Sequence, residues 1–411
     1  KIRVLAGFPA VIIKQIPVIS SRDTVVVTCD AFDTNGTVKK YFWYREGYKL
    51  IDSTLEPEIA VRYYGRSPQK IICKVVDDDG LINHDSALIH FNRPPESTVK
   101  SPADTVSVGE SEFPYPVKFI VSCSDPDSDT VKIKLHTGVD FDSMNIVYQG
   151  TDSIIPYNLT QPGETCWKLE VTDSWGNTVS HSGKFTTVLT HTICFVGHSI
   201  VEGMLSDHNH GGFRKGVIDG LRDSLPLHER LKSVGPLITP EMQSYPADDS
   251  CLAISGTTAK EIYLLLTRVS PQLKSDIWVL LLGVNDWYST GEKNYIVKII
   301  DIMLARNPAS RVYVLNSVPV SEEHVYSGSI NYNLPDFNKA LEDSINVRRV
   351  GGNSVYLVNM FTLLTKDNAF DPTWFSDPLH PNQDGYDRIA DEILRIMYQD
   401  SSRALRKPEE K

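Results

Sequence analysis

The pattern of hydrophobic residues changes near residue 190, and this change limits the folds open to the chain. Before it, short apolar runs alternate with period two between turn sequences such as Asp33-Thr34-Asn35-Gly36, which predicts antiparallel β-sheets. After it, compact apolar runs such as 276–282 alternate with segments of helical spacing such as 295–304. A strand that is apolar throughout is buried on both faces, so the second part is predicted as a parallel sheet between two layers of helices.

The length of 411 residues suits several domains. We predict two all-β sandwiches over 1–94 and 95–189, an α/β domain over 190–400 and a polar tail over 401–411. The sequence Arg93-Pro94-Pro95-Glu96-Ser97 is typical of a short, stiff linker between the first two. No apolar run reaches the roughly 18 residues of a membrane-spanning helix. Because the chain starts at Lys1, we expect a mature product whose signal peptide has been removed.

The formal net charge of −11 argues against a nucleic-acid partner, because binding to phosphates requires clustered Lys and Arg. Hydrophobic residues make up 41% and charged residues 23%, an ordinary balance for folded domains. The oligomeric state does not follow from these numbers.

Four of the six cysteines form two similarly spaced pairs in the β-rich part. Cys29 and Cys73 are 44 residues apart, and Cys123 and Cys166 are 43 apart. This spacing suits a bridge between two packed sheets, as in immunoglobulin-like sandwiches. Disulfides would indicate an oxidising compartment, whereas four buried thiols would act as small hydrophobic groups. The remaining two cysteines, at position 194 in a predicted strand and 251 in a predicted loop, are expected to be free.

Four short motifs in the second half together contain every group that acyl transfer requires. A serine hydroxyl is a poor nucleophile until a base removes its proton; Ser199 follows an apolar strand, and His380 is the candidate base. Asp377 lies three residues before His380, close enough to fix the tautomer of the imidazole. The motifs are Gly197-His198-Ser199-Ile200, Ser255-Gly256-Thr257, Gly283-Val284-Asn285-Asp286 and Asp377-Pro378-Leu379-His380-Pro381.

The order and spacing of these motifs, over residues 190–398, resemble the SGNH superfamily of GDSL esterases and lipases. The resemblance implies a three-layer, flavodoxin-like α/β hydrolase domain that needs no cofactor and no metal. It implies a catalytic triad of Ser199, His380 and Asp377. It also implies an oxyanion hole formed by the backbone N–H groups of Ser199 and Gly256 and the side-chain amide of Asn285. Glycine at position 256 is expected because a side chain would hinder close approach of the backbone to the substrate.

Two other features of the motifs bear on this resemblance. The family usually has Asp before the serine, but His198 stands here. It either changes the pH profile or is a tolerated substitution. The segment Gly211-Gly212-Phe213-Arg214 is similar to the Gly-Tyr-Arg segment of acetylxylan esterase-like members. His208 and His210, just before it, are interpreted as part of a polar loop rather than as metal ligands.

The ester that the domain cleaves is predicted from its surroundings. Trp287 and Trp374 flank the motifs and are the candidate substrate-binding residues: they either stack on sugar rings or pack at the strand ends. The polar segment 206–212 is unlike the apolar lid of a lipase. Residues 1–94 resemble PKD and other Ig-like modules of secreted bacterial proteins, which act as spacers or bind glycans. The preferred hypothesis is a secreted serine esterase that removes O-acetyl groups from plant-type polysaccharide or oligosaccharide through an acyl-enzyme on Ser199.

Two alternatives remain open at this point. One is a lysophospholipase or thioesterase of the same superfamily that acts on acyl lipids. The other is an adhesion or glycan-binding protein with a residual hydrolase domain. The complete set of catalytic residues argues against the second.

Overall fold

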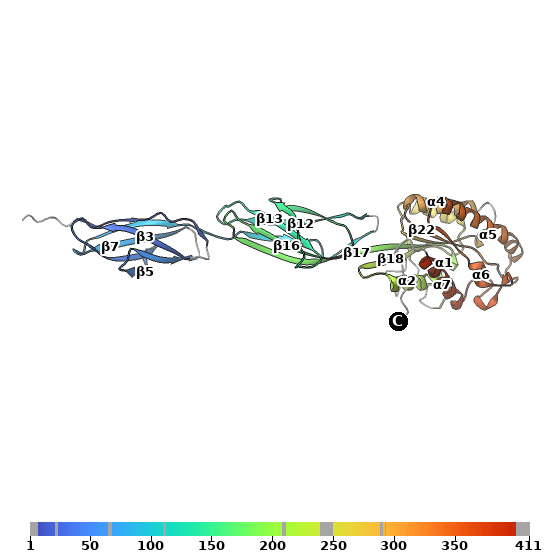
Figure 1. Cartoon of the computed structure of the whole chain (residues 1–411). Helices are drawn as coiled ribbons and strands as arrows, with labels where there is room; N and C mark the ends of the chain where they lie inside the picture. Colours follow the sequence, from blue (N-terminus) through green and yellow to red (C-terminus); the bar gives the residue numbers. More distant parts are fainter. Residues whose placement is uncertain are drawn as a thin grey trace, which may run out of the picture. The chain divides into compact units, whose positions relative to one another are not determined.

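The computed structural model divides the chain into two compact units (Figure 1). The first consists of residues 1–105, 116–159 and 164–185, and the second of 106–115, 160–163 and 186–411. The tail predicted over 401–411 lies outside the described residues. The structure describes residues 7–20, 24–64, 68–109, 112–207, 211–238, 250–287, 291 and 293–399.

The first unit is all β, as the period-two pattern predicts. In its N-terminal part, two antiparallel sheets share one hydrophobic core around Val27, Trp43 and Val75, which are fully buried. One sheet has the order β1-β3-β6 and the other β5-β4-β7-β8. The strands are β1 (Ala10–Ile13), β2 (Ile19–Ser20), β3 (Thr24–Phe32), β4 (Val38–Arg45), β5 (Lys49–Thr54), β6 (Glu58–Arg62), β7 (Gln69–Asp77), β8 (Ile82–Ile89) and β9 (Phe91–Asn92).

The later part of this unit repeats the arrangement of two sheets. The order β10-β12-β15 forms one sheet, and β14-β13-β16 continues to β17 in the other. Phe119 and Trp167 join the two sheets at a ring distance of 5.4 Å. The strands are β10 (Glu96–Lys100), β12 (Tyr115–Ser124), β13 (Lys132–Gly138), β14 (Asn145–Gly150), β15 (Ile154–Leu159) and β16 (Gly163–Thr172), together with β11 (Thr105–Val108) and β17 (Thr178–Gly197), which continue into the second unit.

The cysteines of the first pair face each other between the two N-terminal sheets, but they are not bonded. Cys29 on β3 and Cys73 on β7 are buried, and their sulfur atoms lie 3.6 Å apart. A disulfide requires about 2.05 Å. The predicted bridge is therefore corrected to a contact between two free thiols.

The disulfide predicted for the second pair is wrong for a geometric reason. Side chains alternate between the two faces of a strand. Trp167 points into the core against Phe119, so its neighbour Cys166 points to the opposite face, where its thiol contacts the Val139 carbonyl at 3.7 Å. Cys123 lies on the inner face of β12 with Phe119. The two thiols are therefore on different sides of the β16 sheet, and both are free.

The second unit contains the predicted parallel sheet. Its order is β17-β21-β22-β23, and β18 and β20 pair with the other edge of β17, all in parallel. Cys251 lies in β20 and is buried, so the expected loop at this position is wrong. The strands are β18 (Glu229–Ser233), β19 (Leu237–Ile238), β20 (Ser250–Ala253), β21 (Ile277–Leu281), β22 (Arg311–Leu315), β23 (Val355–Val358), β24 (Thr365–Lys366) and β25 (Ala369–Phe370).

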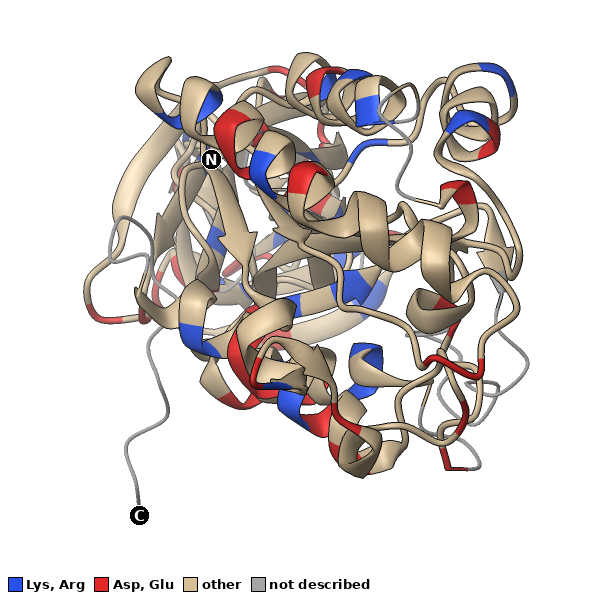
Figure 2. Ribbon diagram, turned by 90° about the vertical axis from the view of Figure 1, so that its right-hand side faces the viewer, with Lys and Arg blue, Asp and Glu red and all other residues tan. Residues whose placement is uncertain are grey.

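Helices cover both faces of this sheet, as predicted (Figures 1 and 2). Ile193 and Phe195 of β17 belong to a core with α2 and α7, whereas Cys194 and Val196 belong to a core with α3, α4 and α5. Figure 2 shows acidic and basic segments interspersed along these helices. The helices are α1 (Ser199–Glu202), α2 (Phe213–Ser224), α3 (Ala259–Leu264), α4 (Lys293–Arg306), α5 (Ser327–Val350), α6 (Met360–Leu364) and α7 (Gln383–Gln399), with π- or 3-10 turns at Leu265–Val269, Val284–Asp286 and Pro372–Trp374.

Candidate active site

Ser199 lies at the carboxyl edge of the sheet, where β17 passes into the short helix α1. The turn brings β17 very close to β21: a Cβ on Gly197 would lie only 2.3 Å from the Leu281 carbonyl oxygen. Glycine is therefore required two residues before the serine. Ser199 is 4% exposed, and its backbone N–H opens the first turn of α1, where N–H groups have no partner within the helix.

The loop before α7 brings His380 and Asp377 to this serine. His380 Nε2 lies 2.9 Å from Ser199 Oγ, and His380 Nδ1 lies 2.8 Å from Asp377 Oδ2. Because a carboxylate accepts at Nδ1, that nitrogen carries the proton, and Nε2 is left to accept from the serine hydroxyl. The three residues thus form one continuous chain of hydrogen bonds across 181 residues of sequence.

The loop itself holds Asp377 in its ionised form. Burial raises the pKa of Asp377, but hydrogen bonds from the backbone and ring of His380 and from the backbone of Leu379 outweigh it, so the net pKa is lowered. The backbone N–H groups of Leu379 and His380 donate to Oδ1 at 2.7 and 2.6 Å. Oδ2 is therefore left for the imidazole.

Three adjacent parallel strands deliver the other predicted residues to the same edge. Gly256 follows β20, and Asn285 follows β21, on either side of the strand that carries Ser199. The Asn285 amide donates to the Thr257 carbonyl at 2.9 Å, which places Asn285 against the turn that contains Gly256. An amide NH₂ has two donors, so the second remains for another acceptor.

The structure gives a different reason for glycine at position 256. A Cβ there would meet no atom within 4 Å, so crowding by the protein does not require glycine. The backbone has φ of +77°, a left-handed conformation that favours glycine over residues with a side chain. Open space lies on this side of the turn.

Glu202 is a site residue that the sequence motifs did not reveal. One carboxylate oxygen of Glu202 accepts from the Ser255 backbone N–H at 2.8 Å and from the Ser255 hydroxyl. It thereby ties the turn around Gly256 to the helix that begins at Ser199. The signal in the sequence is its position three residues after the serine, because residues i and i+3 share a helix face.

His198 faces an apolar cavity rather than the hydrogen-bond chain. It is 1% exposed, and Leu281, Val284 and Val318 are among the residues lining this cavity. Burial and the neighbouring His380 lower its pKa to about 3, so the ring is neutral at physiological pH. Its Nδ1 has no hydrogen-bond partner among the described residues. This environment favours the tolerated substitution over a tuning role.

Trp287 lies on the rim just after Asn285 and forms an exposed aromatic pair. It stacks on Tyr326 with ring centroids 4.7 Å apart, and the two are 46% and 50% exposed. Its φ of +51° is costly for a bulky residue, and such strain gathers at functional sites. Asn333 of α5 donates to the Trp287 carbonyl at 3.0 Å and anchors it. No sequence motif indicated Tyr326, because the pair is formed between segments far apart in the chain.

Trp374 makes more contacts with the protein than Trp287 does. The guanidinium of Arg388 covers its ring at 4.1 Å, and the ring packs against the core under α7. One face of Trp374 is therefore occupied by the protein, and the predicted contact with sugar rests on the remainder of the ring.

Among the described residues, no group of three or more His, Cys, Asp and Glu side chains is placed to hold a metal ion. His208 and His210, interpreted above as a polar loop, lie outside the described residues. None of the described helices is long and apolar enough to cross a membrane.

The sequence profile of the GDSL-like lipase/acylhydrolase family matches residues 195–388. This region is a GDSL-like lipase/acylhydrolase domain. The match contains Ser199, Gly256, Asn285, Asp377 and His380, so the whole hydrogen-bonded constellation lies within the GDSL-like domain. By its family, the GDSL-like domain is a carboxylic ester hydrolase. No curated protein sequence matches the chain.

Several solved structures are similar to the GDSL-like domain at low identity. A family 3 carbohydrate esterase from Clostridium thermocellum is 20% identical over 50% of this chain and 94% of that one, with a TM-score of 0.39. A carbohydrate esterase family 3 protein from Talaromyces cellulolyticus is 21% identical over 51% and 97%, with a TM-score of 0.38. A GDSL-like lipase from Bacteroides thetaiotaomicron is 18% identical over 51% and 88%, with a TM-score of 0.36.

Proposed function

We propose that this protein is a secreted serine esterase that removes O-acetyl groups from polysaccharide or oligosaccharide of the plant type, as acetylxylan esterases do. The observation that carries the proposal is the hydrogen-bond chain from Ser199 through His380 to Asp377, with distances of 2.9 and 2.8 Å. Those distances lie within the reach of a general base and of the group that orients it.

The first half-reaction forms an acetyl-enzyme. Ser199 Oγ attacks the acetyl carbonyl carbon while His380 Nε2 takes the hydroxyl proton. The tetrahedral intermediate collapses, the ester C–O bond breaks, and the sugar oxygen leaves with the proton from His380. Asp377 remains ionised and stabilises the imidazolium, because its own pKa is lowered by the hydrogen bonds around it.

The second half-reaction releases acetate. His380 takes a proton from water, the hydroxide attacks the acetyl carbon, and Ser199 leaves with the proton returned by the imidazolium. In both halves the negative oxygen receives hydrogen bonds from the N–H groups of Ser199 and Gly256 and from the second N–H of Asn285. Donors fixed in advance in this way stabilise charge that develops only in the transition state.

A carbohydrate substrate is supported by the surface around the triad. The exposed, stacked rings of Trp287 and Tyr326 present a flat aromatic surface of the kind that packs against sugar rings. Tyr and Trp combine a large apolar face with a polar tip, which suits a ligand with hydroxyl groups on its edges. The all-β part of the chain is proposed to act as Ig-like spacers, in keeping with its two-sheet arrangement.

The test is acetate release from acetylated xylan, acetylated pectin and p-nitrophenyl esters of increasing acyl length, with Ser199→Ala alongside. We expect release that depends on Ser199 and falls steeply beyond the acetyl group. Equal rates on acetyl and long acyl esters would favour an acyl-lipid hydrolase. No serine-dependent release from any of these esters would contradict the proposed function.

A further inference from the structure

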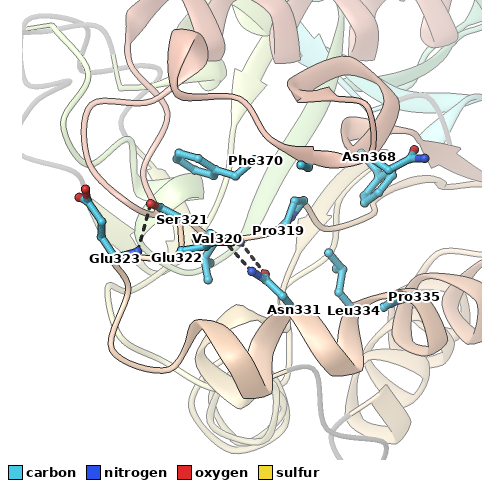
Figure 3. Close-up of a pocket in the computed structure, with 12 residues that line it drawn as sticks. Pro319, Val320, Ser321, Glu322, Glu323, Asn331, Leu334, Pro335, Asn368 and Phe370 are labelled. Carbon is cyan, nitrogen blue, oxygen red and sulfur yellow. Dashed lines mark hydrogen bonds between the residues drawn. The ribbon is translucent and has the colours of Figure 1, made fainter.

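A large cavity lies next to the catalytic loop, at the carboxyl ends of β22 and β23. Its volume is about 760 Å³, within the range of small-molecule sites. Residues 319–323 form one wall, α5 the floor, and the hairpin β24–β25 the opposite wall (Figure 3). In open α/β sheets, ligands bind at this edge of the strands. We refer to it as the β22 pocket.

The β22 pocket is joined directly to the triad loop. Ser321, which lines the pocket, donates its backbone N–H to the Pro378 carbonyl at 2.9 Å. Pro378 follows Asp377. Val320 lines both the β22 pocket and the small cavity that reaches His198. The β22 pocket therefore lies directly beside the loop that carries Asp377 and His380.

The wall formed by residues 319–323 is fixed before any ligand arrives. The Asn331 amide binds both backbone groups of Val320, receiving from its N–H and donating to its carbonyl at 2.9 Å each (Figure 3). Two turns further along α5, the Asn338 amide binds both backbone groups of Ser317 in the same way, at 3.0 and 2.8 Å. A site held in shape by such contacts binds with less loss of conformational entropy.

The lining of the pocket combines aromatic rings with carboxylates, two kinds of side chain that suit the recognition of carbohydrates. Phe361 and Phe370 contribute aromatic rings, and Phe370 faces the 319–323 wall from the opposite side (Figure 3). Glu322 and Glu323 are exposed carboxylates at the pocket, and no Lys or Arg is among the residues that line it. Carboxylates accept hydrogen bonds from sugar hydroxyls, but they repel ligands that carry negative charge.

We infer that the β22 pocket is a subsite for the glycan chain next to the acetylated unit, and that Glu322 and Glu323 select neutral glycans over polyuronides. The inference rests on the proposed deacetylase function, since the acetyl ester at Ser199 anchors the chain whose neighbouring units enter the pocket. Acetylated xylan is a neutral probe, and acetylated polygalacturonate is the matching anionic one.

The first test fills the pocket. Ala369 is exposed on β25 and lines the cavity, so Ala369→Trp places a large ring in it while the fold is retained. We expect kcat/KM on acetylated xylo-oligosaccharide to fall about 10-fold, which corresponds to about 1.4 kcal/mol, with p-nitrophenyl acetate unchanged. The control is Val347→Trp, at an exposed position of α5 outside the lining, which should change neither rate.

The second test removes the charge. Glu322→Gln with Glu323→Gln should raise kcat/KM on acetylated polygalacturonate several-fold at low salt, with little effect at high salt, where charges are screened. Acetylated xylan should change less than about twofold, as expected for a charge effect confined to the anionic probe. Glu342→Gln with Asp391→Asn removes the same net charge from exposed positions outside the pocket, and it should leave the ratio between the two polymers unchanged.

The outcomes separate the two proposals. If Ala369→Trp leaves the oligosaccharide rate intact, or lowers the p-nitrophenyl acetate rate equally, the pocket is not a subsite, although serine-dependent deacetylation stands. If the Glu322/Glu323 variant and the Glu342/Asp391 variant shift the ratio alike, selection by the pocket carboxylates is wrong. If the wild-type protein shows no hydrolysis that depends on Ser199, the proposed function itself is wrong.

Discussion

Two histidines, His198 and His380, lie next to Ser199, and their surroundings differ in almost every physical respect. On one side His380 is bonded to the serine and to an ionised carboxylate, at 2.9 and 2.8 Å. On the other side His198 is sealed against an apolar cavity, with a pKa of about 3. The same imidazole is placed to move a proton in one environment and is fixed in its neutral form in the other. Neighbouring charge and burial therefore assign the two roles.

The strongest test of this contrast replaces each of the two histidines in a separate variant. His380→Ala should lower kcat by about 10⁴-fold or more, because Ser199 loses its base. His198→Asn, which keeps a neutral amide in the cavity, should lower kcat by less than about 10-fold, as expected for a group that takes no proton in the reaction. Steady-state hydrolysis of p-nitrophenyl acetate measures both. Similar losses in the two variants would contradict the different roles assigned to His380 and His198.

The hydrogen-bond chain at Ser199 can be weakened at Asp377 without removing the base, His380. Asp377→Asn keeps the shape of the carboxylate but no longer stabilises the imidazolium or fixes its tautomer, so kcat should fall by about 10²–10⁴-fold. Asp371→Asn changes a carboxylate that caps the 3-10 turn in the same loop and contacts the Trp374 side chain, and its rate on p-nitrophenyl acetate should stay near that of the wild type. Equal effects in these two variants would show that the loop, rather than the Asp377 charge, supports His380.

The proposed oxyanion donors can be tested through the side chain of Asn285. Asn285→Ala removes the amide next to the Gly256 turn, and kcat should fall by about 10²–10³-fold while KM changes little, because the donor acts on charge that forms in the transition state. A rise in KM with unchanged kcat would instead make Asn285 a substrate-binding residue.

The buried position of His198 should affect the pH dependence of the free energy of unfolding rather than the rate of hydrolysis. The folded pKa of His198 lies near 3 and its ordinary value is 6.5, so below pH 6.5 the unfolded chain binds a proton that the native protein does not. This single group lowers the free energy of unfolding by up to about 1.4 kcal/mol per pH unit as pH falls from 6.5 toward 3, and contributes nothing above 6.5.

Urea unfolding of the full chain between pH 5 and 8 checks this prediction. His198→Asn lacks the titrating ring, so its stability should depend less on pH than that of the wild type below 6.5, with parallel curves above it. Curves that run parallel over the whole range would mean that His198 is protonated in the native protein.

Much of the fold could be read from the pattern of hydrophobic residues. The apolar run at 276–282 became β21, and the helical spacing at 295–304 became α4. Helical spacing of apolar residues is clear in the sequence over 334–345, whereas α5 runs over Ser327–Val350, because the added turns contain only one buried apolar residue, Ile330, and so lack the periodic signal. Cys251 was misplaced in a loop because a four-residue strand gives too short a run to recognise.

The two cysteine pairs show where spacing alone stops being informative. Both pairs have nearly the same separation in sequence, yet one pair meets between facing sheets and the other is split by the strand alternation at Trp167. A shift of one residue turns a side chain to the other face of the sheet. Spacing in sequence does not resolve that difference.

The architecture of the second unit and the residues of its Ser-His-Asp hydrogen-bond chain were predictable from the sequence, because strand periodicity and short motifs are local properties of the chain. The groups that support these residues became visible only in the folded structure. Glu202 holding the Gly256 turn, Tyr326 stacking on Trp287, and the β22 pocket between α5 and a hairpin all join residues far apart in sequence. Such contacts depend on how side chains pack across elements, and packing is settled only once the elements have come together.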